Sequence, residues 1–243
     1  MSKLRKGLNI LGIIALVSLV IYLIMSIQYS LIDISRKIDI NYHLTTIRQY
    51  QSEKTSNTMS RMIEANLYIY NSTTGHTGSG THITLKGEHY ILSCAHLIDN
   101  PSDVIRARDD TLRESELVLV KYNQKFDLAL YRIVNPAVAN NRYVELGIQE
   151  PEIGNSIIIV GNPHGELNIV TEGIVARKET KGYLLTNLAF FGNSGGGMYY
   201  KGELVGVVTQ LRSLQELPKF IYTNYSYGIG LRAVNIFLEE YLK

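Results

Sequence analysis

The sequence contains very little cysteine: Cys94 is the only one among 243 residues. An intramolecular disulfide, a C-x-x-C redox pair and a cysteine-based zinc site are therefore excluded. Long basic runs and basic stretches interleaved with aromatic residues are also lacking, and the formal net charge is only +2. Nucleic acid is therefore not expected as a partner. We also expect no metal and no other cofactor.

The last histidine of the chain is His164, and its position limits the chemistry of a later glycine-rich stretch. Residues 192–196, "GNSGG", match the nucleophile-elbow pattern G-x-S-x-G around Ser194. In α/β-hydrolases the acid and the histidine both follow the serine, so that class is excluded. The chymotrypsin order of histidine, acid and serine remains. A glycine-rich turn without a catalytic role is the alternative interpretation.

The N-terminus has a basic start, "MSKLRK", followed by nearly unbroken apolar residues from 8 to 27. About 20 residues at ~1.5 Å each span ~30 Å, the thickness of a hydrocarbon core, so the run predicts a transmembrane helix. The basic residues favour a cytoplasmic N-terminus and place the remaining chain outside the cytoplasm, in the periplasm or the extracellular space. We therefore predict a signal anchor over residues 1–28. A cleaved signal peptide is the alternative, but no A-x-A-like site follows the run.

Residues 29–62 are predicted to form a stalk helix and a linker. Ile27, Leu31, Ile34 and Ile38 lie at helical spacing before the pattern weakens. A short coiled-coil contact is the alternative interpretation, although the pattern does not last the roughly three to four heptads that a coiled coil requires.

The region from residue 63 to 243 is predicted to form one domain, because short β-rich runs alternate there with turn signals. Examples are "ANLYIYN", "DLALYRIV", "NSIIIVGN" and "GELVGVVTQ". Many short strands with no helical segments between them predict an all-β barrel or sandwich. Only the C-terminal stretch "AVNIFLEEYLK" is typical of a short helix.

Three residues stand in the order that chymotrypsin-type catalysis requires. A serine hydroxyl is a poor nucleophile at neutral pH, so it needs a base and a buried carboxylate that orients the base. His96 follows an apolar strand in "YILSCAHLID", and Asp127 precedes another in "KFDLALYRI". Each alone is typical of a structural residue, but together with Ser194 they predict a catalytic triad.

At these residues the sequence resembles a known family. "SCAH", "FDLAL" and "GNSGGG" are similar to the three catalytic blocks of trypsin-like serine peptidases. "GSGTHITLKGEHYILSCAHLID", "VGNPHGELNIVTEGIVA" and "YGIGLRAVN" resemble the HtrA/Deg branch. The resemblance implies two six-stranded antiparallel β-barrels with the active site in the cleft between them. It also implies a possible homotrimer, whereas the PDZ domain usual in that branch is not expected here.

The resemblance also implies the role of each site residue. His96 is the general base, Asp127 its orienting acid and Ser194 the nucleophile. The segment Gly192, Asn193 and Ser194 forms the oxyanion hole, with the backbone N–H groups of Gly192 and Ser194 as donors. Asn193 stands where many digestive enzymes have aspartate, and a neutral amide cannot pair with a new N-terminal amine. We therefore expect activity without zymogen cleavage.

The resemblance further implies where the side chain before the scissile bond binds. The segment before the serine and the strand after it form the pocket: Leu188, Ala189, Phe190, Thr209, Gln210 and Leu211. Neither segment contains the carboxylate that cleavage after lysine or arginine requires. We therefore expect protein and peptide substrates, unfolded or misfolded, cut after small aliphatic residues. The alternative is that Phe190 and Phe191 pack in the barrel core and the pocket lies elsewhere.

Other functions remain as alternatives for the same residues. One is a catalytically silent protein that binds peptides, and another is a membrane-anchored chaperone or scaffold. A metal site from His82, His89 and His96 has a spacing that suits no common ligand motif. Cys94 could act as a nucleophile, but a small core residue is its expected role.

Overall fold

The computed structural model describes residues 22–23, 25–28, 30–31, 57–135, 138, 142–217 and 220–242. The chain divides into two compact units, Met1–Tyr50 and Gln51–Lys243. In the first unit the described residues are helical, and their side chains are exposed.

Most of the predicted transmembrane helix, residues 8–27, and most of the predicted stalk lie outside the described residues. Within the described ranges, every helix is too short or too polar to span a bilayer. The anchor and the domain boundaries at residues 28 and 62 therefore remain predictions.

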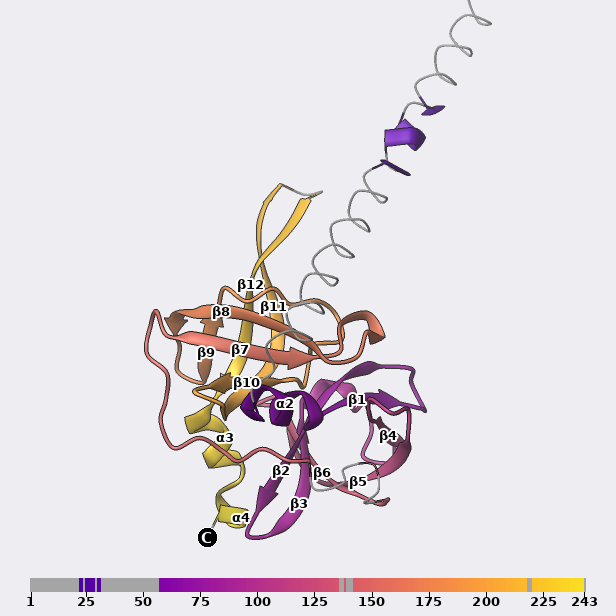
Figure 1. Ribbon diagram of the computed structural model, residues 1–243. Coiled ribbons are helices and arrows are strands. Elements are labelled where there is room, and N and C mark those ends of the chain that lie inside the picture. The colour runs from indigo at the N-terminus through magenta and orange to yellow at the C-terminus, as the bar shows by residue number, and fades with distance from the viewer. Residues whose placement is uncertain are drawn as a thin grey trace, which may run out of the picture. The chain divides into compact units, whose positions relative to one another are not determined.

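The second unit contains two closed six-stranded barrels (Figure 1). In the first barrel the strands follow the order β1-β2-β3-β6-β5-β4, and in the second the order β10-β11-β12-β9-β8-β7. All strand pairs within the barrels are antiparallel. The two-barrel fold predicted from the sequence is thus confirmed.

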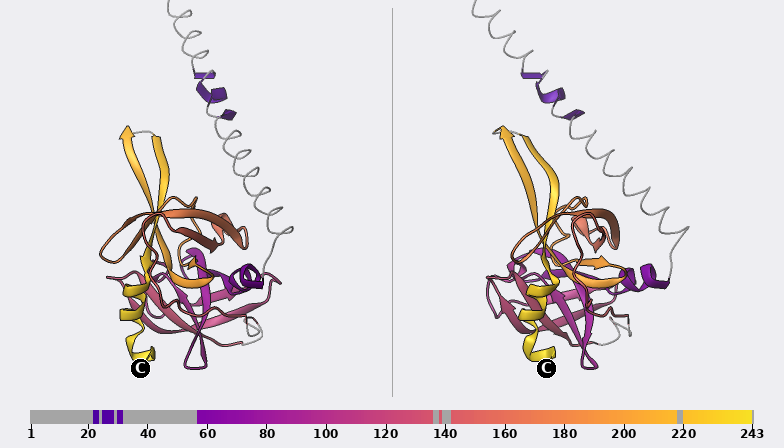
Figure 2. Two further views of the ribbon diagram at one scale, coloured as in Figure 1. Left: turned by 60° about the vertical axis from the view of Figure 1, so that its left-hand side comes forward. Right: turned by 90° about the vertical axis from the view of Figure 1, so that its left-hand side faces the viewer.

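The strands of the first barrel are β1 (Asn66–Asn71), β2 (Thr77–Leu85), β3 (Glu88–Ser93), β4 (Ile105–Arg108), β5 (Glu114–Asn123) and β6 (Leu128–Ile133). Those of the second barrel are β7 (Ser156–Gly161), β8 (Ile169–Lys178), β9 (Gly182–Leu185), β10 (Gly197–Tyr200), β11 (Glu203–Leu217) and β12 (Phe220–Gly230). Figure 2 shows that the β11–β12 hairpin extends well beyond the second barrel.

Each barrel encloses its own apolar core. In β1 the side chains of Leu67 and Ile69 are almost completely buried, while the intervening Tyr68 is only partly buried. This alternation follows from the pleat, which directs successive side chains to opposite faces. The second core is built in the same way around Ile157 and Ile159. Burial of each such side chain contributes about 1.5–3 kcal/mol, so the two cores hold the barrels closed.

Helices flank the barrels at both ends of the second unit: α2 (Asn57–Glu64), α3 (Leu231–Phe237) and α4 (Glu239–Leu242). The predicted short C-terminal helix is present as α3 and α4. It returns to the first barrel, where Lys121 Nζ lies 2.7 Å from Glu240 Oε1 and the rings of Tyr90 and Tyr241 are 5.7 Å apart. At the other end, α2 buries Met62. Residues 57–62, which the sequence placed in the stalk and linker, thus belong to this helix.

Candidate active site

The register of β3 and β6 brings His96 and Asp127 together. Ser93, the last residue of β3, pairs with Ala129 of β6, so the chain after β3 and the chain before β6 meet at one edge of the first barrel. His96 lies there in the 3₁₀ turn η1 (Ala95–Leu97). Its Nδ1 is 2.8 Å from Asp127 Oδ2, and its backbone N–H donates to Asp127 Oδ1 at 2.9 Å. Both carboxylate oxygens therefore hold the same histidine.

The Asp127 carboxylate sets the tautomer and the charge of His96. Because Oδ2 accepts the Nδ1–H, Nε2 of the neutral ring carries the lone pair that a general base needs. The same hydrogen bond raises the pKa of His96 above its ordinary value of 6.5, although burial opposes this. Asp127 itself lies in the left-handed region at φ 53°, which aspartate tolerates better than most residues.

The other ring nitrogen of His96 contacts a residue that the sequence analysis assigned to the core. His96 Nε2 lies 3.5 Å from Cys94 Sγ, and Cys94 is completely buried. Burial raises the pKa of the Cys94 thiol, so its neutral form faces the ring. Within the described residues no hydrogen bond joins His96 to Ser194. Such bonds are often long in unliganded proteases and tighten when substrate binds.

Ser194 lies in a loop that has room only for glycine on both sides. Gly192 has φ +100°, and a Cβ there would lie 2.5 Å from the carbonyl oxygen of Asn162. Gly195 has φ +89°, and a Cβ there would collide with the carbonyl oxygen of Ser79. The loop therefore packs its main chain directly against both barrels, and Ser194 is left half-buried at the surface of the cleft.

The carbonyl groups of this loop are held inward by hydrogen bonds. His164 N–H donates to Phe191 O at 2.8 Å, and Gly196 N–H donates to Asn193 O at 2.9 Å. In a trans peptide the N–H points away from the C=O, so the amides of Gly192 and Ser194 face the opposite way. Within the described part of the chain, neither amide has an acceptor. Two unpaired backbone N–H donors on the same loop are the groups from which an oxyanion hole is built.

Asn193, which lies between Gly192 and Ser194, does not present its own amide to the cleft. Its backbone N–H donates to Phe190 O at 3.0 Å, so it is not free for a substrate. Its side chain is buried, and the Oδ1 atom lacks a hydrogen-bond partner among the described residues. The Asn193 side chain is therefore packed next to Gly161, the last residue of β7.

A cleft of about 930 Å³ contains His96, Gly192 and Ser194. Its lining residues are Gly75, His76, Thr77, His96, Leu97, His164, Phe190, Phe191, Gly192, Ser194, Val208, Thr209, Gln210 and Leu211. Four of the six predicted pocket residues are among them. Leu188 and Ala189 are not, and Ala189 is buried. Phe191 does not pack in the core, because 78% of it is exposed.

The cleft also contains residues that the sequence analysis did not single out. Thr77 is the first residue of β2 and His76 precedes it, whereas His164 comes from the turn η3 (Pro163–Gly165). The ring of His164 lies 5.8 Å from that of Phe190. The "GSG" and "GNPHG" stretches beside them contributed to the prediction only as parts of the family resemblance. Nothing in the sequence alone showed that these two stretches meet.

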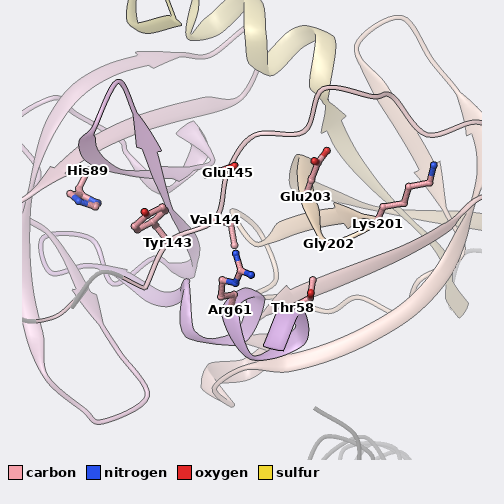
Figure 3. A pocket seen from close by; sticks show the side chains of 9 residues that line it. All are labelled: Thr58, Arg61, His89, Tyr143, Val144, Glu145, Lys201, Gly202 and Glu203. Carbon is pink, nitrogen blue, oxygen red and sulfur yellow. The ribbon is translucent and has the colours of Figure 1, made fainter. Parts of the chain in front are cut away.

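A second cavity, of about 660 Å³, lies apart from these residues (Figure 3). Its lining comes from α2, the first barrel, the connection between the barrels and the β10–β11 turn: Thr58, Arg61, His89, Tyr143, Val144, Glu145, Lys201, Gly202 and Glu203. Of the three histidines that the sequence offered as a metal site, His82 and His89 lie together, with His82 Nε2 3.1 Å from His89 Nδ1. His96 instead lines the cleft with Ser194. In the described ranges, no three His, Cys, Asp or Glu side chains are placed to hold a metal ion.

Comparison with known proteins agrees with this geometry. A family model described as a trypsin-like peptidase domain matches residues 78–207, which is more than half of the chain. The chain therefore belongs to the trypsin-like peptidase domain family.

Similar curated proteins include bacterial Deg proteases. The periplasmic serine endoprotease DegP of Salmonella typhimurium is 32% identical over 146 residues, which cover 55% of this chain and 30% of that protein. The periplasmic pH-dependent serine endoprotease DegQ of Escherichia coli is 29% identical over 147 residues, with 55% and 31% coverage. The chain thus matches about a third of the length of these relatives.

A solved structure extends the likeness to the fold. The crystal structure of the serine endoprotease from Yersinia pestis superposes with a TM-score of 0.63 at 27% identity. The match covers 78% of this chain and 67% of that one. The resemblance to the HtrA/Deg branch is therefore supported by sequence and by structure.

The hydrogen bond between His96 and Asp127 predicts the pH dependence of hydrolysis. As the predicted general base, His96 must be neutral to act, and a raised pKa moves the loss of activity on acidification to higher pH. We expect kcat/KM to fall on acidification with a midpoint above 6.5. Asp127→Asn should lower this midpoint and also lower kcat about 10⁴-fold through the wrong tautomer. A pH–rate profile with a fluorogenic peptide measures both.

His89→Gln provides the control, because His89 lies outside the cleft and should leave the midpoint unchanged. A wild-type midpoint at or below 6.5 that Asp127→Asn does not move would contradict the prediction.

Proposed function

We propose that this chain is a serine endopeptidase of the HtrA/Deg type. One observation carries the proposal: the His96–Asp127 pair of the first barrel and Ser194 of the second line the same cleft, beside two unpaired backbone amides. A nucleophile, a base with its orienting acid, and oxyanion donors are the components that acyl transfer requires. The names of the DegP and DegQ relatives support the same activity.

The proposed reaction follows from these positions. Ser194 Oγ attacks the peptide carbonyl carbon while His96 Nε2 takes the hydroxyl proton, and Asp127 stabilises the imidazolium that forms. The carbonyl oxygen becomes an oxyanion facing the amides of Gly192 and Ser194. When the C–N bond breaks, His96 gives its proton to the leaving amine. Water then attacks the acyl-enzyme, with His96 again as the base, and releases the acid and Ser194.

We propose small aliphatic residues as the preferred side chains before the scissile bond. No aspartate or glutamate is among the described lining residues of the cleft, so a bound lysine or arginine would lack a counter-ion. Phe190, Val208 and Leu211 give the cleft apolar walls. Apolar residues are exposed to a protease when a protein is unfolded, which supports unfolded or misfolded proteins as the substrate class.

We further propose that the protease domain works outside the cytoplasm on a single N-terminal anchor. The support is the apolar run of residues 8–27 after a basic start. The helical residues Tyr22, Leu23, Met25 and Ile27 are each at least half exposed, as expected for side chains that face lipid. The relatives named as periplasmic agree with this side of the membrane.

Loss of the triad tests the activity. Ser194→Ala and His96→Ala should each lower kcat at least about 10³-fold, because triad members act as one unit. Hydrolysis of an unfolded casein-like protein by the full chain measures this. Ser156→Ala, at an exposed serine of β7, is the control with wild-type activity expected.

Reaction with a serine-directed fluorophosphonate separates an enzyme from a catalytically silent peptide-binding protein. Wild type should be labelled at Ser194 and Ser194→Ala should not. An unlabelled wild type, or near-normal hydrolysis by Ser194→Ala, refutes the proposed activity.

Cleavage-site sequencing on an unfolded protein tests the pocket. Most cuts should follow Val, Ala, Ile or Leu, and Phe190→Ala should shift the preference to bulkier residues because a ring is removed from the wall. Leu188→Ala is the matched comparison, since Leu188 does not line the cleft and the preference should stay. A majority of cuts after lysine or arginine would rule out the apolar pocket.

Accessibility to added protease tests the topology. In spheroplasts carrying the full chain with an N-terminal tag, the domain after residue 63 should be digested and the tag protected. The reverse pattern contradicts the orientation, and a mature protein without residues 1–30 contradicts the anchor. A cytoplasmic protein in the same cells reports whether the membrane is intact.

A further inference from the structure

A buried hydrogen-bond network joins the two barrels behind the Ser194 loop. Its centre is Ser79 of β2, which is completely buried, as is Asn162 at the end of β7. The Asn162 backbone N–H donates to Ser79 Oγ at 2.8 Å, and Asn162 Nδ2 is 3.2 Å from the same oxygen. Ser79 Oγ in turn donates to Gly192 O at 2.7 Å. A chain of polar contacts thus ends on the carbonyl of an oxyanion-hole residue.

The donors and acceptors around Ser79 determine the direction of each hydrogen bond in this network. The backbone N–H and the side-chain Nδ2 of Asn162 can only donate, and the Gly192 carbonyl can only accept. The single hydroxyl proton of Ser79 must therefore point at Gly192. Asn162 is itself held in place, because its Nδ2 donates to Leu67 O at 2.9 Å and its Oδ1 accepts from Asn66 Nδ2 at 2.9 Å.

Ser79 contacts the loop at both residues whose amides are unpaired. Its hydroxyl holds the carbonyl of Gly192, and its backbone N–H donates to Ser194 O at 2.7 Å. Gly192 has no side chain and an unusual φ of +100°, so hydrogen bonds rather than packing must hold the peptides on either side of it. The Ser79 hydroxyl is the side-chain donor that holds the Gly192–Asn193 peptide.

We infer that Ser79 is a positioning residue that keeps the Gly192 and Ser194 amides directed at the oxyanion through its hydrogen bond to the Gly192 carbonyl. The inference rests on the proposed function and adds a residue outside the triad. The Gly192–Asn193 peptide links the Phe191–Gly192 peptide, whose carbonyl accepts from His164, to the Asn193–Ser194 peptide, whose carbonyl accepts from Gly196. Without the Ser79 hydroxyl this linking peptide can rotate, and the Gly192 and Ser194 amides on either side of it lose their fixed relative position. Because the oxyanion forms only in the transition state, the loss falls on kcat rather than on KM.

The test compares two buried serines. Ser115 of β5 is also buried, and its Oγ donates to Glu116 O at 2.9 Å and accepts from Asn135 N at 2.8 Å, entirely within the first barrel. Ser79→Ala should lower kcat about 10–100-fold with KM changed less than about twofold. Ser115→Ala should lower the thermal midpoint comparably and leave kcat unchanged.

Two further measurements separate positioning from general destabilisation. The affinity of Ser79→Ala for a peptide boronic acid, which imitates the tetrahedral oxyanion, should fall by the same factor as kcat. Ser79→Cys keeps the shape of the side chain and a weak donor, so its kcat should lie between wild type and Ser79→Ala. If Ser79→Ala does not fold, the comparison of kcat between Ser79→Cys and wild type still tests the inference.

Wild-type kcat in Ser79→Ala, or a loss of kcat matched by Ser115→Ala, overturns the inference. Failure of the proposed function has a different signature: the wild type neither hydrolyses casein nor reacts with fluorophosphonate. In that case crystal structures of the wild type and Ser79→Ala test the positioning directly. A Gly192 carbonyl that still points inward in Ser79→Ala contradicts it, and a rotated peptide supports it.

Discussion

The main chain of the Ser194 loop lies against both barrels without intervening side chains, and the site depends on this contact. Gly192 approaches the Asn162 carbonyl of the second barrel, and Gly195 approaches the Ser79 carbonyl of the first. Hydrogen bonds from His164 and Gly196 hold the loop carbonyls inward. Two amides consequently point at the cleft, so oxyanion stabilisation is prepared before substrate arrives.

The proposed chemistry is divided between the barrels. The first barrel supplies the base and its acid, because the β3–β6 register places His96 beside Asp127. The second supplies the nucleophile and the oxyanion donors. Neither barrel alone can carry out acyl transfer, so the hydrogen bonds of Ser79 to the Ser194 loop, which cross between the barrels, have a direct chemical consequence.

Much of this could be predicted from the sequence because it depends on local pattern or on order. Alternating apolar residues, as in "NLYIYN", predicted strands, and the pleat requires that alternation whenever one face is buried. The order of His96, Asp127 and Ser194 excluded the α/β-hydrolase arrangement. The apolar run of residues 8–27 predicted a membrane span by its length alone, and it stays a prediction.

Other features were decided only by the tertiary structure. Ser79 and Gly192 are 113 positions apart, and no periodicity connects them, because their contact depends on how two closed barrels pack. The same applies to His76 and His164 in the cleft, and to Leu188, which the sequence placed in the pocket and the fold leaves outside its lining. The sequence by itself thus determined the order of these groups along the chain, and it predicted which of them the proposed chemistry uses. Folding decided which of their atoms are paired or free, because a hydrogen bond forms only where two surfaces meet within about 3 Å.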